Sequence, residues 1–154
     1  RYTRLGREGS KLGMPTSGIW GEAGKYRGGS YENGIILWSK DTGAHHVKGL
    51  FFGAFSDAGG RKRLGLPMTD LIDTKDGGTR QRFTHGTLYQ PPRSTEVFAL
   101  WGALDEKYRD MGGASSRCGY PTSSMVVDDA GAAAAFENGS ITSTHANGVQ
   151  VHCN

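Results

Sequence analysis

The chain has 154 residues, of which 36% are hydrophobic and 21% charged, which fits one globular domain or a few small repeats and excludes a disordered chain. The formal charge is +3, and the one dense basic cluster, Arg61–Arg63, is too short for a nucleic-acid-binding stripe. The same mild charge equally fits a weak attraction to anionic envelope polymers. No apolar run approaches the roughly 20 residues of a membrane helix, so we expect no membrane insertion.

A Gly-x-Pro corner recurs along the chain. It occurs at Leu12–Pro15, Leu64–Pro67 and Cys118–Pro121. The corner glycines are 52 and 54 residues apart, a regular period that indicates tandem repeats. The chain holds 25 glycines, roughly twice the usual share of about 7%, and this predicts short elements joined by tight turns.

A second motif follows each corner, with an aromatic residue, two polar residues and a glycine. It occurs at Tyr31–Gly34, Phe83–Gly86 and Phe136–Gly139. Asn-Gly between alternating residues is a strong hairpin signal, so we expect three β-hairpins. The predicted turn pairs are Asn33-Gly34, His85-Gly86 and Asn138-Gly139. This register places the aromatic residues on a core face, and it leaves the opposite face mostly polar and in water.

Two segments are predicted to be helical, Leu50 to Ala58 and Leu100 to Met111, the second because its apolar residues recur at helical spacing. The glycine pair at 112–113 is expected to end the second helix. Each predicted repeat thus holds a short helix, a Gly/Pro corner and a β-hairpin. The expected repeats are residues 1–49, 50–99 and 100–154. One such unit buries too little surface to fold alone, so we expect an α+β fold with shared cores and pseudo-threefold organisation, as a closed propeller-like ring or a short arc.

The two cysteines, Cys118 and Cys153, favour a disulfide in an oxidising compartment. Closing that loop would contribute roughly 4 kcal/mol in the chain-entropy model. Two unrelated reduced thiols are the alternative. No Cys-x-x-Cys or zinc-finger spacing is present, so we expect no structural zinc.

No recognisable catalytic motif is present: the chain has no Gly-x-Ser-x-Gly elbow, no His-Glu-x-x-His, no phosphate-binding loop and no dinucleotide fingerprint. The acidic neighbours Asp105-Glu106 and Asp128-Asp129 do not converge as the two carboxylates of a glycosidase do. The histidines are interpreted as surface residues, although a metal site assembled from several repeats stays open. We therefore expect no enzymatic activity, no cofactor and no metal.

Sugar binding requires aromatic faces together with planar polar side chains. Tyr89 is the best candidate because the predicted alternation places it on the outer face. Gln81, Arg82 and His85 cluster on the same hairpin, although an ordinary polar strand surface is the alternative for them. Trp38 shares the predicted core-side face and is expected to be core or rim more often than a ligand platform.

These motifs resemble the LGFP repeat. Leu64–Pro67 matches three of the four residues of its eponymous tetrapeptide, and Gln81–Tyr89 resembles the Gln-x-Phe-x-x-Gly-x-Ile-Tyr segment that follows. The third copy departs from this pattern, with Cys118 in place of Leu and Ala134 in place of Gln, and the first copy has Gly29 at the Gln position. The resemblance implies a secreted or envelope protein of actinobacteria, in which such repeats attach a catalytic domain to cell-wall polysaccharide.

The expected function is therefore a non-catalytic carbohydrate-binding module that targets a secreted protein to a bacterial surface. The expected partners are cell-wall polysaccharide or another glycan, together with a fused or associated secreted protein. A protein-interaction adaptor in a secreted complex or toxin is the alternative. A hydrolase is the third possibility.

Overall fold

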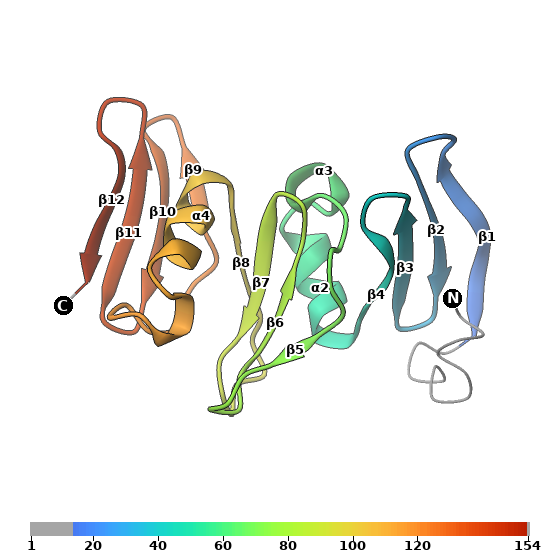
Figure 1. Cartoon of the computed structure of the whole chain (residues 1–154), viewed down its shortest axis with the longest axis horizontal. Coiled ribbons are helices and arrows are strands. Elements are labelled where there is room, and N and C mark those ends of the chain that lie inside the picture. The colour runs from blue at the N-terminus through green and yellow to red at the C-terminus, as the bar shows by residue number, and fades with distance from the viewer. Residues whose placement is uncertain (1–13, 154) are drawn as a thin grey trace.

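The computed structural model describes residues 14–153, and it shows a mostly β-sheet protein with a few short helices (Figure 1). Three antiparallel four-stranded sheets follow one another along the long axis of the molecule, with helical segments between them. No sheet in this part of the chain closes into a barrel or propeller, and the predicted closed ring is not confirmed. Leu12 and Gly13 of the first predicted corner lie outside the described residues.

The elements keep chain order within each sheet. The first sheet contains β1 (Pro15–Glu22), β2 (Tyr26–Tyr31), β3 (Gly34–Ser39) and β4 (Gly43–Lys48). The second contains β5 (Ile72–Asp73), β6 (Thr79–Arg82), β7 (Gly86–Gln90) and β8 (Phe98–Trp101). The third contains β9 (Val126–Asp128), β10 (Gly131–Phe136), β11 (Gly139–Thr144) and β12 (Gly148–Cys153). The helices are α2 (Gly49–Asp57), α3 (Arg61–Leu64), α4 (Gly102–Asp110) and the 3-10 helix η2 (Gly113–Ser115).

The central two strands of each sheet form the three predicted hairpins, but each turn lies one residue earlier than predicted. The motif glycine is the first residue of the next strand, where it pairs with the motif aromatic, as Gly139 does with Phe136. Glycine is required there because the neighbouring fourth strand of the sheet passes very close. A Cβ atom on Gly34 would collide with the carbonyl oxygen of Val47, and one on Gly86 with that of Leu100.

The predicted helices exist, but the second begins later than predicted. Leu100 belongs to strand β8, and α4 starts at Gly102, whose φ of 68° suits glycine. A short buried apolar run does not by itself distinguish strand from helix, which is why β8 was not predicted. Within α4 the predicted spacing is confirmed for Leu104 and Tyr108, which are both buried.

Each pair of neighbouring sheets shares one hydrophobic core, and the helix between them packs into it. The first core consists of Ile35, Leu37, Val47, Phe51, Phe55, Leu64, Phe83, Leu88 and Ala99. The second core consists of Tyr89, Leu100, Leu104, Tyr108, Cys118, Met125, Ala134, Phe136 and Ile141. The middle sheet contributes to both, since Leu88 of β7 lies in the first core and its neighbour Tyr89 in the second.

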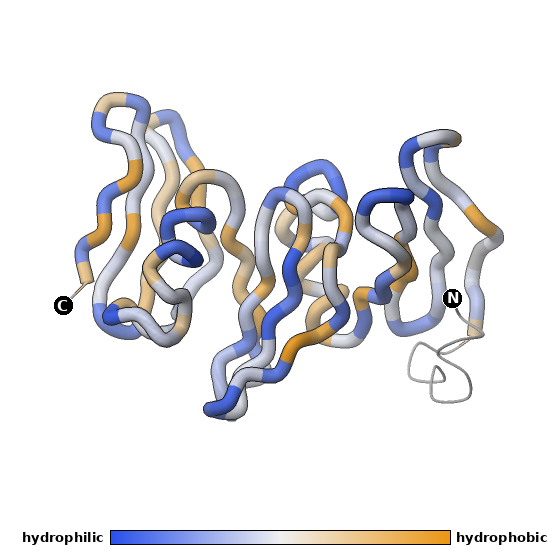
Figure 2. The backbone as a smooth tube through the Cα atoms, viewed as in Figure 1, coloured by the Kyte–Doolittle hydropathy of each residue, from blue (hydrophilic) through white to orange (hydrophobic). Residues whose placement is uncertain are grey.

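Both faces of the middle sheet are therefore buried, and the prediction that one face of each hairpin is wet is wrong there. Thr87, predicted on the wet face, is fully buried. The corresponding residue of the first sheet, Ile35, is also buried. The third sheet has only one core-facing side: β12 alternates between partly buried valines and the exposed residues Gln150 and His152, an alternation visible in Figure 2.

The same pair of hydrogen bonds ties each corner to the hairpin turn beside it. The backbone N–H after the motif aromatic donates to the third corner residue, in the pairs Glu32–Met14, Thr84–Leu66 and Glu137–Tyr120. The side-chain oxygen of the same turn residue accepts the N–H of that corner residue in all three places. The turn position therefore requires a side chain that can accept a hydrogen bond.

Gln81 joins the first two sheets through a buried amide. It is fully buried, and its Nε2 donates to the carbonyl oxygens of His46 (2.8 Å) and Thr69 (3.0 Å). We predict that Gln81→Leu lowers the free energy of unfolding by about 2 kcal/mol, because it leaves two carbonyl groups without their donor. Urea unfolding measures this loss. Gln150→Leu on the exposed face of β12 is the matched control, and equal stability of the two variants would refute the role of Gln81.

Candidate functional site

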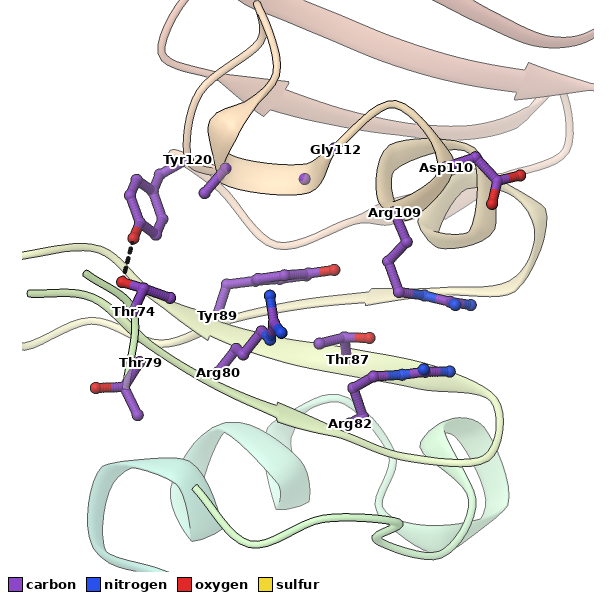
Figure 3. A pocket seen from close by; sticks show the side chains of 12 residues that line it. Thr74, Thr79, Arg80, Arg82, Thr87, Tyr89, Arg109, Asp110, Gly112 and Tyr120 are labelled. Atoms are coloured by element: carbon purple, nitrogen blue, oxygen red, sulfur yellow. Dashed lines mark hydrogen bonds between the residues drawn. The ribbon is translucent and has the colours of Figure 1, made fainter. Parts of the chain in front are cut away.

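A cavity of about 350 Å³ opens between the second sheet and the segment formed by α4 and η2 (Figure 3). Arg80 and Arg82 line it from β6, and Thr87 and Tyr89 line it from β7. From the other side it is lined by Arg109, Asp110, Gly112, Gly113, Ala114 and Tyr120, with Thr74 and Thr79 near one end. Most of the lining residues therefore have polar side chains, and three of them are arginines.

Strand alternation explains why these side chains meet. Arg80 pairs with Tyr89 across β6 and β7, and Arg82 pairs with Thr87, so all four side chains lie on the same face of the sheet. Residues two apart on one strand are about 7 Å apart, which lets both guanidinium groups reach one ligand. Gln81, between them, points to the opposite face.

A buried carboxylate organises the floor of the cavity. Asp105 of α4 is 1% exposed. Its Oδ1 accepts a hydrogen bond from the Tyr89 hydroxyl (2.7 Å), and its Oδ2 accepts one from the Thr87 hydroxyl (2.8 Å). The Nε of Arg109 donates to the same Oδ2 at 3.1 Å. Three donors thus hold both carboxylate oxygens, and Asp105 in turn fixes the position of Arg109.

Apolar residues occupy the corresponding places in the first core. Counting from the strand glycines 34 and 86 and the helix glycines 49 and 102, the equivalents of Thr87, Tyr89 and Asp105 are Ile35, Leu37 and Phe52. These three residues belong to the first core or pack against it. A buried ionic network is often no more stabilising than a well-packed apolar cluster. Stability alone therefore does not explain why Thr87, Tyr89 and Asp105 are polar at the interface between the second and third sheets.

Burial is the largest influence on the pKa values of Asp105 and Tyr89. Burial raises the pKa of the Asp105 carboxyl above its usual value, and the hydrogen bonds from Tyr89, Thr87 and Arg109 oppose that rise. Burial also raises the pKa of the Tyr89 hydroxyl well above its usual value, and the nearby charge of Asp105 raises it further. Tyr89 consequently stays a hydrogen-bond donor to Asp105 at neutral pH.

Tyr120 forms the end of the cavity that lies away from Arg109, next to Thr74. Its hydroxyl donates to Oδ1 of Asp76 (2.6 Å) and is hydrogen-bonded to the Thr74 hydroxyl (2.9 Å; Figure 3). The hydrogen bond from Thr74, followed by that from Tyr120, lowers the pKa of Asp76. Gly78 allows this contact, since a Cβ atom there would collide with the Tyr120 hydroxyl. The loop of the second sheet is thus fixed against the third corner.

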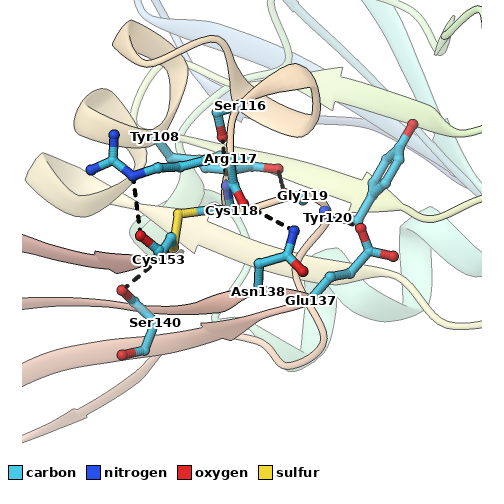
Figure 4. The surroundings of a disulfide bond; sticks show 10 residues. All are labelled: Tyr108, Ser116, Arg117, Cys118, Gly119, Tyr120, Glu137, Asn138, Ser140 and Cys153. Atoms are coloured by element: carbon cyan, nitrogen blue, oxygen red, sulfur yellow. Dashed lines mark hydrogen bonds between the residues drawn. A yellow bond between two sulfur atoms is a disulfide. The ribbon is translucent and has the colours of Figure 1, made fainter.

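The predicted disulfide is confirmed, and it anchors the corner that carries Tyr120 (Figure 4). It joins Cys118 to Cys153 at the end of β12, with 5.1 Å between the Cα atoms. On the same corner, the backbone N–H of Tyr120 donates to Oε1 of Glu137 (3.0 Å). The disulfide therefore connects the end of the last strand to one wall of the cavity.

The structure brings together only some of the predicted ligand residues. Arg82 and Tyr89 both line the cavity, but the prediction that Tyr89 is exposed is wrong: it is 4% exposed because α4 covers that face of the sheet. Gln81 is buried on the first-core side, away from the cavity. His85 is exposed at its turn and lines a neighbouring cavity together with Arg109.

Trp38 lies on a different sheet from the cavity. It is 46% exposed, which excludes a core position and leaves the rim position of the two that were predicted. The face it shares with Ile36 lies opposite the first core, because Ile35 and Leu37 are the residues of β3 that enter that core. Trp38 therefore does not contribute to the candidate site.

Sequence reasoning missed most residues of the site, and four of them matter most to its chemistry. These are Arg80, Asp105, Arg109 and Tyr120. Arg80 could have been found, because residues two apart on a strand share a face and Arg82 was already a candidate. Asp105 showed a weaker signal, since one turn of helix separates it from Arg109 and it lies next to the apolar residue Leu104. Tyr120 is distant in sequence from the others, and only the fold brings it near.

Residues 14–153 contain neither a metal-binding cluster nor a membrane-spanning helix. That part of the chain has no group of three or more His, Cys, Asp or Glu side chains able to hold a metal ion. It also has no helix that is both long and apolar enough to span a membrane.

The family model described as LGFP repeat matches two adjacent segments, residues 12–62 and 64–116, which together make up more than half of the chain. No curated protein matches the sequence. The second matched segment contains both strands that line the cavity, and it extends through α4.

The raised pKa of Asp105 predicts a pH dependence of stability. Between the ordinary carboxyl pKa and the raised one, the folded protein holds a proton that the unfolded chain has released. The contribution of Asp105 to the free energy of unfolding is therefore largest below its unfolded pKa, and it falls as the pH rises through the folded pKa. We predict that Asp105→Asn abolishes this fall.

Urea unfolding of the protein and of Asp105→Asn between pH 4 and 7 measures the effect. The difference in unfolding free energy, wild type minus variant, should decrease with rising pH. A difference that stays constant or increases with pH would contradict a carboxyl whose pKa is raised by burial. Asp110→Asn, on the last turn of the same helix, is a suitable control.

Proposed function

The chain belongs to the LGFP repeat family, and from that premise we propose that it is a non-catalytic module that binds envelope polysaccharide. In this role it holds a secreted protein at a bacterial surface. The observation that carries the proposal is the cavity between the second sheet and α4, where the apolar trio of the first core gives way to a polar one. A set of donors fixed in advance binds a polar ligand at a smaller entropic cost than mobile side chains do.

The chemistry of the lining suits sugar recognition. Arg80, Arg82 and Arg109 offer planar, multidentate N–H donors that match oxygen-rich ligands. Tyr120 adds an aromatic ring at one end, the type of surface that packs against the apolar face of a sugar. The disulfide and the Asp105 network hold the two walls in position, which supports a preformed site.

The arrangement of carboxylates favours binding over hydrolysis. Asp105 is 1% exposed and hydrogen-bonded through both oxygens, so it is not accessible to a substrate. Asp110 is the one carboxylate among the lining residues named above. A glycosidase needs an acid and a base or nucleophile about 5–10 Å apart across the scissile bond. The lining therefore supports a non-catalytic role.

The third sheet is proposed to be a third copy of the repeat, adding to the two that the family model matches. It repeats the reciprocal hydrogen bonds between corner and turn. It differs from the first copy on one face, where Ser140 and Thr142 take the places of Ile35 and Leu37 and no other sheet of the described structure covers them.

A disulfide supports a secreted location, because such bonds persist in oxidising compartments. Together with the family, it fits an extracellular protein that works at the cell wall. A protein-interaction adaptor is the second candidate, and exposed apolar residues on the outer face of the first sheet favour it: Ile19 is 79% exposed, and Trp38 lies on the same face.

Co-sedimentation with insoluble actinobacterial cell walls, before and after removal of their polysaccharide, tests the proposed function. We expect binding to intact walls, its loss with the polysaccharide, and at least tenfold weaker binding by Arg82→Ala. Trp38→Ala is the matched control and should bind as the wild type does. Binding that survives removal of the polysaccharide, or that depends on Trp38 and not on Arg82, would transfer the function to a protein partner.

A further inference from the structure

The cavity carries an excess of positive charge that the protein does not neutralise. Arg80 and Arg82 come from β6, and Arg109 reaches toward them from α4 on the other side (Figure 3). Of the three, Arg109 is the one with a salt bridge to a described residue, its bond to Asp105. Neither Arg80 nor Arg82 forms a salt bridge within residues 14–153.

Arg82 also has an unsatisfied donor. Its Nε atom is buried and has no hydrogen-bond partner within the described part of the chain. Leaving a buried charged donor unpaired is costly, and a shift of the guanidinium group toward a bound acceptor would remove that cost. An anionic oxygen is the strongest such acceptor for a guanidinium group.

Arg109 is held in an orientation suited to a bound anion. Its Nε donates to Asp105, whose two oxygens are fixed by Tyr89 and Thr87. The Nη atoms form no hydrogen bond within residues 14–153 that would occupy them. They therefore remain free to bind two oxygens of one anionic group in the bidentate geometry that arginine favours.

From these contacts we propose that the ligand carries an anionic group, a carboxylate or a phosphodiester on a sugar, which binds between Arg80, Arg82 and Arg109. This inference rests on the proposed function, and it specifies the chemical class of glycan. The volume of about 350 Å³ lies at the small end of the range for ligand pockets, so it suits one or two sugar units. Three guanidinium groups stand against two carboxylates, the buried Asp105 and the lining residue Asp110, which leaves one positive charge that a neutral glycan cannot balance.

Defined saccharides test the anionic group without relying on wall binding. Calorimetric titrations compare an oligogalacturonide and a glycerol-phosphate oligomer with a neutral oligogalactoside of matched length. At least one anionic ligand should bind tenfold or more tightly than the neutral one, and its affinity should fall as NaCl rises from about 0.1 to 0.5 M. Equal affinity for anionic and neutral ligands, or no binding of either anion, would overturn the inference.

Variants locate the site. Arg80→Gln and Arg82→Gln keep polar side chains but remove the charge, and each should weaken binding of the anionic ligand about tenfold. Arg27→Gln, an exposed arginine on the first sheet, is the matched control and should bind normally. Thermal unfolding shows whether each variant is folded. If folded Arg80→Gln and Arg82→Gln bind the anion as the wild type does, the assigned site is wrong.

Chemically treated walls then identify the source of the anion. Reducing the wall carboxyl groups to alcohols removes uronates, and hydrofluoric acid removes phosphodiesters. If only one of the two treatments abolishes binding, the group that this treatment removes is the anion that the protein binds. Binding to native walls that survives both treatments overturns the anionic inference and leaves the proposed wall-binding function standing. Absence of binding to native walls overturns the wall-binding function, while the saccharide titrations still decide the anionic group.

Discussion

The sharing of cores between neighbouring sheets is the constraint on which the rest of the structure depends. Each sheet is too small to bury its own hydrophobic surface, so it packs through a helix onto the next. The middle sheet is consequently buried on both faces, with Leu88 facing one way and Tyr89 the other. A substitution on either face changes an interface between units, and so a single strand can support the fold on one side and shape a site on the other.

The interface between the second and third sheets shows such a substitution of one face. Thr87, Tyr89 and Asp105 replace an apolar trio with a hydrogen-bonded one, and the network fixes Arg109 at the rim of a cavity. The buried carboxylate would be a poor choice for packing alone. Its physical value lies in holding a cationic side chain in one orientation, opposite the arginines of β6. The fold and the proposed anion site are thus linked by one buried residue.

The repeated glycine motifs predicted the hairpins, the apolar spacing predicted the second helix, and the pair of cysteines predicted the disulfide, because each of these signals is local. They did not predict the reason for the hairpin glycines, since Gly34 and Gly86 are required by the close approach of the neighbouring fourth strand and not by a left-handed turn. Two assignments were wrong for one reason: Tyr89 was predicted on an exposed face, and Trp38 on the core-side face. Alternation shows which residues share a face, but which face is covered depends on the neighbouring unit.

The most direct test is a heteronuclear NMR titration of the ¹⁵N-labelled domain with polysaccharide solubilised from actinobacterial walls. We expect the largest shifts of backbone and arginine side-chain signals around Arg80, Arg82 and Arg109, on both walls of the cavity. Signals of the outer face of the first sheet, including the indole N–H of Trp38, should stay in place. Shifts confined to that outer face, with the arginine signals unchanged, would contradict the account.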